Sequence, residues 1–135
     1  MLQLAALRRG ETLFDLGAGD GRIIIEAVRH FGARAVGVEI DPERVDRIRK
    51  RLNATGTQAQ LIEADLFQVD LSSADVITIY LSPSANLRLA QKLKAELKKG
   101  ARVVSLDYTL PGLALEKELT VNASGIQRKI YSYKT

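Results

Sequence analysis

Apolar residues along this 135-residue chain follow two different periods. In five short segments they form runs or alternate with polar residues, which predicts buried strands at 12–17, 34–40, 58–64, 74–81 and 101–108. Between several of these segments apolar residues recur every three or four positions, which predicts amphipathic helices at 20–31, 41–56 and 84–100. Strands that alternate with helices predict right-handed β-α-β units, and therefore a parallel sheet with helices on both faces.

Several of the predicted helix ends carry residues that suit such ends. In the segment 41–56, Asp41 can cap the first turn and Pro42 suits the first helical position. In the segment 84–100, Gly100 is expected to stop the helix, because glycine readily adopts the left-handed backbone that ends many helices. We therefore expect helix boundaries close to these residues.

The last part of the chain follows a different pattern. Apolar and polar residues alternate over 113–121 and 125–135, and "NASG" separates the two segments. Alternation on both sides of a short turn of small and polar residues predicts a β-hairpin. The parallel sheet should therefore finish with an antiparallel pair of strands.

Composition narrows the class of protein. The length and the 46% of hydrophobic residues fit one globular domain over residues 1–135. No cysteine and a single histidine leave no basis for disulfides or for a cysteine- or histidine-based metal site, so no metal is expected. No run of about 18 apolar residues predicts a membrane span, and there is no signal peptide, so we expect a cytoplasmic protein. Few sulfur-containing residues beside 27% charged residues are typical of a thermophile.

The formal net charge of +4 changes this picture only slightly. An acidic partner such as nucleic acid would suit a positive charge, but a solvated charged surface explains so small a surplus better. Cationic residues gather on one predicted helix, and we interpret them as a solvated face rather than an RNA contact. They are Arg44, Arg47, Arg49, Lys50 and Arg51.

A glycine-rich turn follows the first predicted strand, in "LFDLGAGDGRIII" (13–25). The turn would lie at the carboxyl end of a parallel strand, where open α/β sheets bind ligands, and a helix with free N–H groups begins behind it. Gly17, Gly19 and Gly21 give the spacing GxGxG. A dinucleotide site would need glycine at position 22, which is Arg22, and the P-loop pattern for phosphates is absent.

An acidic residue lies at the carboxyl end of each of the first three predicted strands. Asp15 suits a ligand that carries a cation, such as an ammonium group. Glu39, 20 residues after Gly19, can accept hydrogen bonds from both hydroxyls of a ribose. Asp65 can accept from an adenine amino group while the N–H of Leu66 donates to the ring. Each acid alone could be a helix cap or a solvated loop end, but the three together favour a nucleoside ligand.

Three segments resemble motifs of class I S-adenosylmethionine-dependent methyltransferases. "DLGAGDGR" is similar to their first motif, "GVEIDPERV" to their second and "EADLF" to their adenine loop. Longer segments, "GDGRIIIEAVRHFGARAVGVEIDPERV" and "ADLFQVDLSSADVITIYLSPSANLRLAQKLKAELKKGARVVS", resemble a small prokaryotic subfamily. That subfamily includes archaeal protein-lysine methyltransferases of broad specificity and is similar to the lysine methyltransferases of mitochondrial ATP synthase.

The resemblance implies a fold and a cofactor. The fold is the α/β, Rossmann-like methyltransferase sheet of seven strands, six parallel and one antiparallel, with helices on both faces. The cofactor is S-adenosyl-L-methionine. The residues expected to bind it are Asp15, Leu16, Gly17, Gly19, Asp20, Glu39, Ile40, Asp65, Leu66 and Tyr80.

The chain departs from the family in two places. The family usually carries an upstream helix and a "VPTP"-like segment that closes over cofactor and substrate. This sequence begins with "MLQLAALRRGE", inside that region, so the lid segment is expected to be absent. The family also often has "SH" in its fifth strand, where this chain has "SLDY" (105–108). Both departures concern the substrate rather than the cofactor.

Methyl transfer from a sulfonium is an in-line displacement, which needs correct positions and a dry approach rather than a nucleophilic side chain. The walls of the acceptor channel are expected from "IYLSPSAN" (79–86). Tyr80 can supply a ring wall and a hydroxyl, and Ser82 and Asn86 can orient an amine. Asp107 and Tyr108 are weaker candidates at the same rim.

The leading hypothesis is a methyltransferase that acts on lysine amines of proteins, with a protein substrate as partner. An RNA or small-molecule methyltransferase is the alternative enzyme, although "YLSP" stands where base-methylating enzymes have an Asn/Asp-Pro-Pro-Tyr-type tetrad. A non-catalytic module that binds cofactor or a partner is the alternative outside enzymes. The sequence predicts no oligomeric state.

Overall fold

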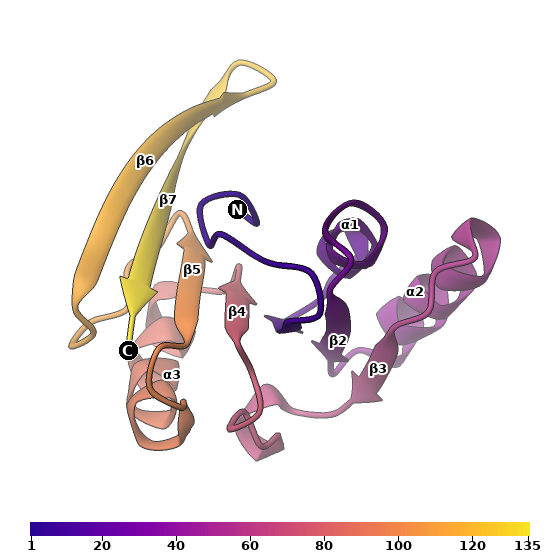
Figure 1. Cartoon of the computed structure of the whole chain (residues 1–135), viewed down its shortest axis with the longest axis horizontal. Coiled ribbons are helices and arrows are strands. Elements are labelled where there is room, and N and C mark those ends of the chain that lie inside the picture. Colours follow the sequence, from indigo (N-terminus) through magenta and orange to yellow (C-terminus); the bar gives the residue numbers. More distant parts are fainter.

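The computed structural model describes all 135 residues, which form one seven-stranded sheet with helices packed against it (Figure 1). The helices are α1 (Arg22–Phe31), α2 (Pro42–Thr55) and α3 (Pro83–Glu96), and Leu66–Gln68 form a short 3-10 turn, η1. No helix has both the length and the apolar character needed to span a membrane. The strands are β1 (Thr12–Leu16), β2 (Arg34–Glu39), β3 (Gln60–Glu63), β4 (Val76–Ile79), β5 (Arg102–Leu106), β6 (Leu115–Ala123) and β7 (Ile126–Lys134).

The strands follow the order β3-β2-β1-β4-β5-β7-β6 across the sheet. The first five strands pair in parallel, and β7 pairs antiparallel with both β5 and β6. Because β6 therefore runs in the same direction as the first five, the expected sheet of six parallel strands and one antiparallel strand is confirmed. The direction of winding reverses between β1 and β4, which opens a crevice at their carboxyl ends.

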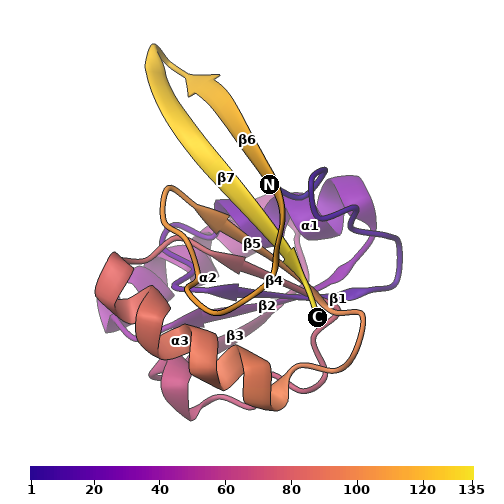
Figure 2. The same cartoon turned by 90° about the vertical axis from the view of Figure 1, so that its left-hand side faces the viewer.

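Helices cover both faces of the sheet, as expected (Figure 2). Side chains of β1 alternate between two apolar clusters, since Leu13 lies in one and Phe14 in the other. The cluster that contains Leu13 also holds Ile24 of α1 and Ile48 of α2, both fully buried. The cluster that contains Phe14 holds Leu89 of α3. The core therefore consists of two layers, with α1 and α2 on one face and α3 on the other.

The start of α2 agrees with the sequence prediction, whereas α1 starts later than predicted. Asp41 Oδ1 accepts the N–H of Glu43 at 3.0 Å, and Pro42 is the first helical residue. α1 begins at Arg22 rather than at position 20, because Gly21 has a left-handed backbone (φ +81°) and lies outside the helix.

The end of α3 also differs from the expectation. The helix ends at Glu96, because Leu97 already has an extended backbone with ψ of 136°. Gly100 instead lies in a turn in which the N–H of Ala101 donates to the carbonyl of Lys98 at 3.2 Å, and its φ is +88°. The chain reverses here to enter β5, so this glycine serves the turn rather than the helix end.

The predicted hairpin forms around a two-residue turn, Ser124 and Gly125, whose φ angles are +52° and +82°. Only residues 130–134 of β7 pair with β5. Residues 126–129 pair with β6 alone, so this part of the hairpin projects beyond the carboxyl end of β5 (Figure 2). The overhanging part of the hairpin therefore flanks the edge of the sheet where the crevice opens.

Candidate active site

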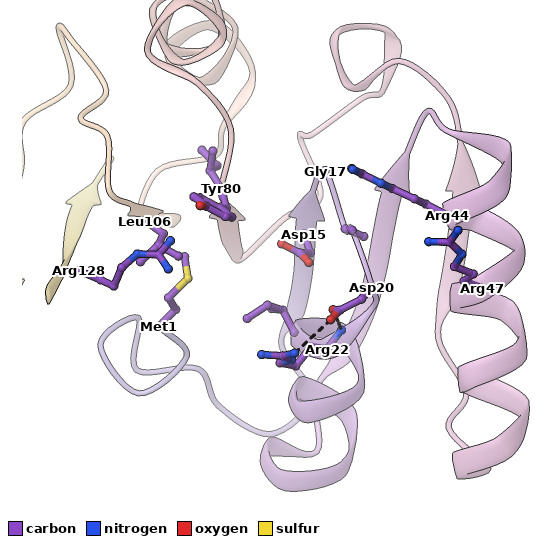
Figure 3. A pocket seen from close by; sticks show the side chains of 14 residues that line it. Met1, Asp15, Gly17, Asp20, Arg22, Arg44, Arg47, Tyr80, Leu106 and Arg128 are labelled. Carbon is purple, nitrogen blue, oxygen red and sulfur yellow. Dashed lines mark hydrogen bonds and ion pairs between the residues drawn. The ribbon is translucent and has the colours of Figure 1, made fainter. Parts of the chain in front are cut away.

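A cavity of about 620 Å³ lies at the carboxyl ends of β1 and β4 (Figure 3). Its walls come from the N-terminal residue, the end of β1 and the β1–α1 loop, the first turn of α1 and the first two turns of α2, the ends of β4 and β5, and the start of β7. The lining residues are Met1, Asp15, Gly17, Ala18, Gly19, Asp20, Arg22, Ile23, Arg44, Arg47, Ile79, Tyr80, Leu106 and Arg128.

The glycine turn forms one wall of this cavity. The N–H groups of Gly17 and Ala18 both donate to the carbonyl of Val38 at 2.9 Å, which fixes the turn to the end of β2. Gly19 has a left-handed backbone (φ +61°), and a Cβ added there would meet only the Gly17 carbonyl oxygen, at 3.8 Å. Because Gly19 lines the cavity, its missing side chain leaves room for a ligand to approach the backbone.

Asp15 supplies a buried carboxyl group to the same cavity. Its Oδ1 accepts a hydrogen bond from the Thr78 hydroxyl at 2.8 Å, and this donor is neutral. Burial raises the pKa of Asp15 to about 7; the Thr78 hydrogen bond opposes the shift, and the carboxylates of Asp20 and Glu39 add to it. A buried carboxyl group without a cationic partner can gain a strong interaction from a ligand ammonium group, which would favour its ionised form.

Glu39 lies at the end of β2 and joins two of these walls. Its Oε1 accepts the N–H of Gly19 at 2.9 Å, and its Oε2 accepts the N–H of Asp41 at 3.1 Å. The side chain is buried and does not line the cavity, whereas its neighbour Ile40 is 64% exposed. Glu39 therefore holds the glycine turn against the start of α2, next to the position where a ribose is expected.

Asp65 and Leu66 lie after β3, at the same edge of the sheet but outside the cavity. Asp65 Oδ1 accepts the N–H of Phe67 at 3.0 Å and caps η1. The N–H of Leu66 belongs to the first residue of η1, so it has no acceptor within this turn. Their contacts with adenine stay a prediction.

The structure brings only part of the expected cofactor set into the cavity. The members that line it are Asp15, Gly17, Gly19, Asp20 and Tyr80. The side chain of Leu16 is fully buried in the core on the α3 face, which leaves only its backbone for a ligand.

The structure does not bring Ser82 and Asn86, which were expected to orient an amine, to the cavity. The Ser82 hydroxyl caps α3 by accepting the N–H of Ala85 at 3.2 Å. Asn86 has no exposed surface, and its amide donates to Ser105 Oγ at 3.2 Å and to the carbonyl of Thr109 at 3.1 Å. Neither residue lines the cavity, because one is used as a helix cap and the other supports the loop after β5.

Sequence reasoning missed four arginines of the cavity wall: Arg22, Arg44, Arg47 and Arg128. Arg44 and Arg47 were expected on a solvated face, but α2 begins beside the glycine turn, so both also reach the cavity (Figure 3). Arg128 lies far from every motif in the sequence, and only the register of β7 brings it to the cavity. No local pattern could have marked it.

Several known methyltransferases are similar to this chain in sequence. The family model described as the ANTKMT methyltransferase domain matches residues 15–117. A protein-lysine N-methyltransferase of Saccharolobus islandicus (strain REY15A) is 36% identical over 136 residues, which cover 98% of this chain and 84% of that protein. The adenine nucleotide translocase lysine N-methyltransferase of Mus musculus is 39% identical over 112 residues, and the match covers 80% of this chain and 48% of the mouse protein.

A solved structure is similar along nearly the whole chain. It is described as an RNA methyltransferase from Salinibacter ruber in complex with S-adenosyl-L-homocysteine. It is 40% identical with a TM-score of 0.90, and the match covers 98% of this chain and 86% of that chain. Its bound ligand is the product form of the expected cofactor.

The residues of the cavity fit S-adenosyl-L-methionine. The buried carboxyl group of Asp15 suits the ammonium of the methionine moiety, and the open side of Gly19 admits a ligand close to the backbone. The N–H of Arg22 donates to Asp20 at 3.0 Å. The N–H groups of Ile23 and Ile24 in the same first turn of α1 suit the carboxylate of the methionine moiety, since the N-terminus of a helix attracts anions. This chain therefore belongs to the ANTKMT methyltransferase domain family and is an S-adenosyl-L-methionine-dependent methyltransferase.

Proposed function

We propose that this enzyme transfers a methyl group to lysine amines of proteins. The observation that carries the proposal is the character of the cavity wall opposite the glycine turn. Met1, Ile79, Tyr80 and Leu106 line it, and the guanidinium beside them, that of Arg128, is paired with Asp107 at 2.6 Å (Figure 3). Such a wall suits the aliphatic stem of a lysine side chain. The relatives named as protein-lysine and adenine nucleotide translocase lysine methyltransferases support the same substrate class.

The methyl donor contributes an electrophilic methyl group on a cationic sulfonium, and the chain contributes position. In the proposal, Asp15 holds the ammonium group, and Glu39 accepts from the ribose hydroxyls with the lone pairs that Gly19 and Asp41 leave free. Asp65 and the N–H of Leu66 hold the adenine. These contacts fix the donor in line with an acceptor amine that enters beside Tyr80.

The acceptor must arrive as a neutral amine. A lysine ammonium has a pKa of about 10.4 in water, so its deprotonation at pH 7 costs about 4–5 kcal/mol. The wall beside Tyr80 and Leu106 lowers this cost, because burial against apolar groups disfavours the charged form. The pairing of Asp107 with Arg128 has the same effect, since it leaves no free carboxylate on this wall to stabilise the ammonium.

An RNA acceptor is the second candidate, and two observations favour it. The solved relative from Salinibacter ruber is described as an RNA methyltransferase, and Arg22, Arg44 and Arg47 line the cavity. However, each of these arginines already has a carboxylate within 4.0 Å, so the rim offers little unpaired positive charge for a phosphate backbone. We therefore favour lysine.

The test is transfer of label from methyl-labelled S-adenosyl-L-methionine to a soluble protein extract and, separately, to total RNA. We expect the label in protein, resistant to nuclease, and recovered as methyl-lysine after hydrolysis. The variant Gly19→Val serves as the inactive control, and Gly56→Val as a matched one, because Gly56 has the same left-handed backbone (φ +63°) outside the cavity. Label that enters RNA and leaves protein unlabelled would overturn the proposal.

A further inference from the structure

We propose that Arg128 is a positioning residue for the methyl acceptor: held by Asp107, it fixes the ring of Tyr80 and the overhanging hairpin as one wall of the acceptor side. The inference concerns the substrate side of the proposed function and rests on it for the identity of the acceptor. The contacts among Asp107, Tyr80 and Arg128 carry it, and these residues come from the ends of β4 and β5 and from β7.

Several contacts attach the Arg128 guanidinium to the carboxylate of Asp107. Arg128 Nε lies 3.0 Å from Asp107 Oδ1 and 2.9 Å from Oδ2, and Nη2 lies 2.6 Å from Oδ2. Both side chains are about three-quarters buried, with 25% and 24% exposed. The Arg128 guanidinium holds the pKa of the Asp107 carboxyl below its usual value, so this partner stays ionised over the neutral range. A pair with several contacts fixes direction as well as distance.

The backbone of Asp107 is itself fixed in an uncommon conformation. Its φ is +68°, in the left-handed region that residues other than glycine seldom adopt. Its N–H donates to the carbonyl of Lys129 at 2.7 Å, one residue beyond Arg128. Asp107 therefore contacts β7 twice, once through its backbone and once through its side chain. Backbone strain of this kind persists where the surroundings hold the residue in place, and it is frequent near ligand sites.

The Arg128 guanidinium, held by Asp107, also lies over the ring of Tyr80. Tyr80 is 53% exposed and lines the cavity, and the guanidinium carbon of Arg128 lies 5.1 Å from the ring centroid (Figure 3). A cation over the face of an aromatic ring is attracted by the ring quadrupole. A half-exposed tyrosine at a strand end would otherwise have freedom to change its side-chain rotamer. Arg128 therefore selects one orientation of the ring beside the cavity.

The same residue attaches the hairpin to the body of the sheet. Arg128 belongs to the part of β7 that pairs with β6 but not with β5. Its neighbour Lys129 forms an ion pair within the hairpin, with Glu118 of β6 at 3.2 Å, and does not line the cavity. These adjacent residues therefore differ in role. Arg128 connects the hairpin to the wall of the cavity, whereas Lys129 connects only the two strands of the hairpin.

This arrangement predicts separate effects on acceptor and cofactor. Apart from Tyr80, the contacts expected for the cofactor lie on Asp15, the glycine turn and the ends of β2 and β3, and the Arg128 guanidinium is not among them. Removing the guanidinium should loosen the ring and the hairpin, and so weaken binding of the acceptor. Binding of S-adenosyl-L-homocysteine should stay unchanged. If Arg128 instead bound the carboxylate of the cofactor, the affinity for S-adenosyl-L-homocysteine would fall.

The experiment compares Arg128→Met, Arg128→Lys and the matched control Lys129→Met. Calorimetry measures the Kd of S-adenosyl-L-homocysteine, and transfer from methyl-labelled cofactor to poly-L-lysine measures KM and kcat. For Arg128→Met we expect KM to rise about tenfold, with Kd within about twofold of wild type. Arg128→Lys should recover part of the loss, because it keeps the charge over the ring. Lys129→Met should match wild type.

A second measurement needs no acceptor. The chain has four tyrosines, so ring carbon labelling gives a simple NMR spectrum in which Tyr80 is assigned with Tyr80→Phe. We expect the ring signals of Tyr80 to shift in both Arg128→Met and Asp107→Asn, and to stay in place in Lys129→Met. Where Arg128→Met does not fold, Arg128→Lys and Asp107→Asn carry both measurements.

Three results would overturn the inference: an unchanged KM in Arg128→Met, a tenfold loss of S-adenosyl-L-homocysteine affinity, or Tyr80 signals that do not respond. The proposed function fails in a different way. Wild-type enzyme would then label total RNA and leave poly-L-lysine unlabelled. The same variants are in that case compared on RNA, and the ring spectrum still tests the contact between Arg128 and Tyr80.

Discussion

The two sides of the cavity are built in different ways. Most of the cofactor side of the cavity comes from one short segment, 15–22, in which backbone conformation and a buried carboxyl group are decisive, and Glu39 supports this segment from the end of β2. The acceptor side comes from Tyr80 just after β4, Leu106 at the end of β5 and Arg128 in β7, which meet only in the folded chain. The first side depends on which residues follow one another, whereas the second depends on strand register. Substitutions should therefore affect the two sides separately.

The substitution expected to affect cofactor binding most is Gly19→Val. A branched side chain at φ +61° is strained, and it would project into the space that the cofactor needs. We expect binding of S-adenosyl-L-homocysteine to be lost in calorimetry, while the chain still folds. Gly56→Val is the matched control, because it shares the strain (φ +63°) outside the cavity. Normal binding by Gly19→Val would mean that the turn is only structural.

The second test concerns the charge of Asp15. Because its pKa is about 7, wild-type affinity for S-adenosyl-L-homocysteine should fall as the pH is lowered through 7 and the carboxyl group becomes protonated. Asp15→Asn should bind about 10–100-fold more weakly at pH 8, the loss expected for a hydrogen bond to a charged group. The variant should also lose this pH dependence, as calorimetry from pH 6 to 8.5 would show. If Asp15→Asn kept wild-type affinity at pH 8, Asp15 would not contact the cofactor.

Asp15→Asn should weaken cofactor binding but increase the free energy of unfolding at pH 8. The pKa of Asp15 is about 7 in the folded chain, against 3.8 for an unperturbed aspartate, so the folded state binds more protons between these values. The contribution of this group to the free energy of unfolding therefore falls as the pH rises from about 4 to 7. At pH 8 we expect Asp15→Asn to be more stable than wild type by about 1–3 kcal/mol, since one pKa unit corresponds to about 1.4 kcal/mol. Urea titrations at pH 5 and pH 8 would measure the difference.

The third test is Glu39→Ala. The change removes the acceptor of the Gly19 and Asp41 N–H groups and the carboxylate expected to bind the ribose. We expect S-adenosyl-L-homocysteine to bind more weakly by about 1–3 kcal/mol. The control is Glu43→Ala, which removes an exposed acid from the first turn of α2 and should bind normally. Tight binding of NADH with no response to S-adenosyl-L-homocysteine would contradict this account of the site.

The smallest expected effects are on the acceptor side. Tyr80→Phe keeps the ring beneath Arg128, so its KM for the acceptor should stay within about twofold of wild type. Tyr80→Leu removes the ring, and its KM should rise about threefold. Tyr80→Phe should also bind S-adenosyl-L-homocysteine as wild type does, because it keeps the ring that lines the cavity. Should Tyr80→Phe lose as much activity as Tyr80→Leu, the hydroxyl rather than the ring would be the important group.

The stretches that were predicted well are those in which neighbours in the sequence decide the conformation. The alternation of strands and helices, the Asp41 cap and the hairpin turn all depend on local steric and hydrogen-bonding preferences. The glycine turn is of the same kind. Gly100 shows the limit of such reasoning, because a glycine with a left-handed backbone can end a helix or form a turn. Gly100 forms a turn, because the chain reverses its direction there to enter β5.

The sequence by itself determined the sheet with helices on both faces, the glycine turn and the row of acids at the carboxyl ends of β1, β2 and β3. Periodicity and chain order are enough to place residues at the carboxyl edge of a parallel sheet. Only the tertiary structure decided which side chains face the cavity. Ser82 and Asn86 lie close to Tyr80 in sequence, yet one caps a helix and the other is fully buried. Arg128 reaches the cavity because a side chain's surroundings depend on the register of strands that are distant in sequence.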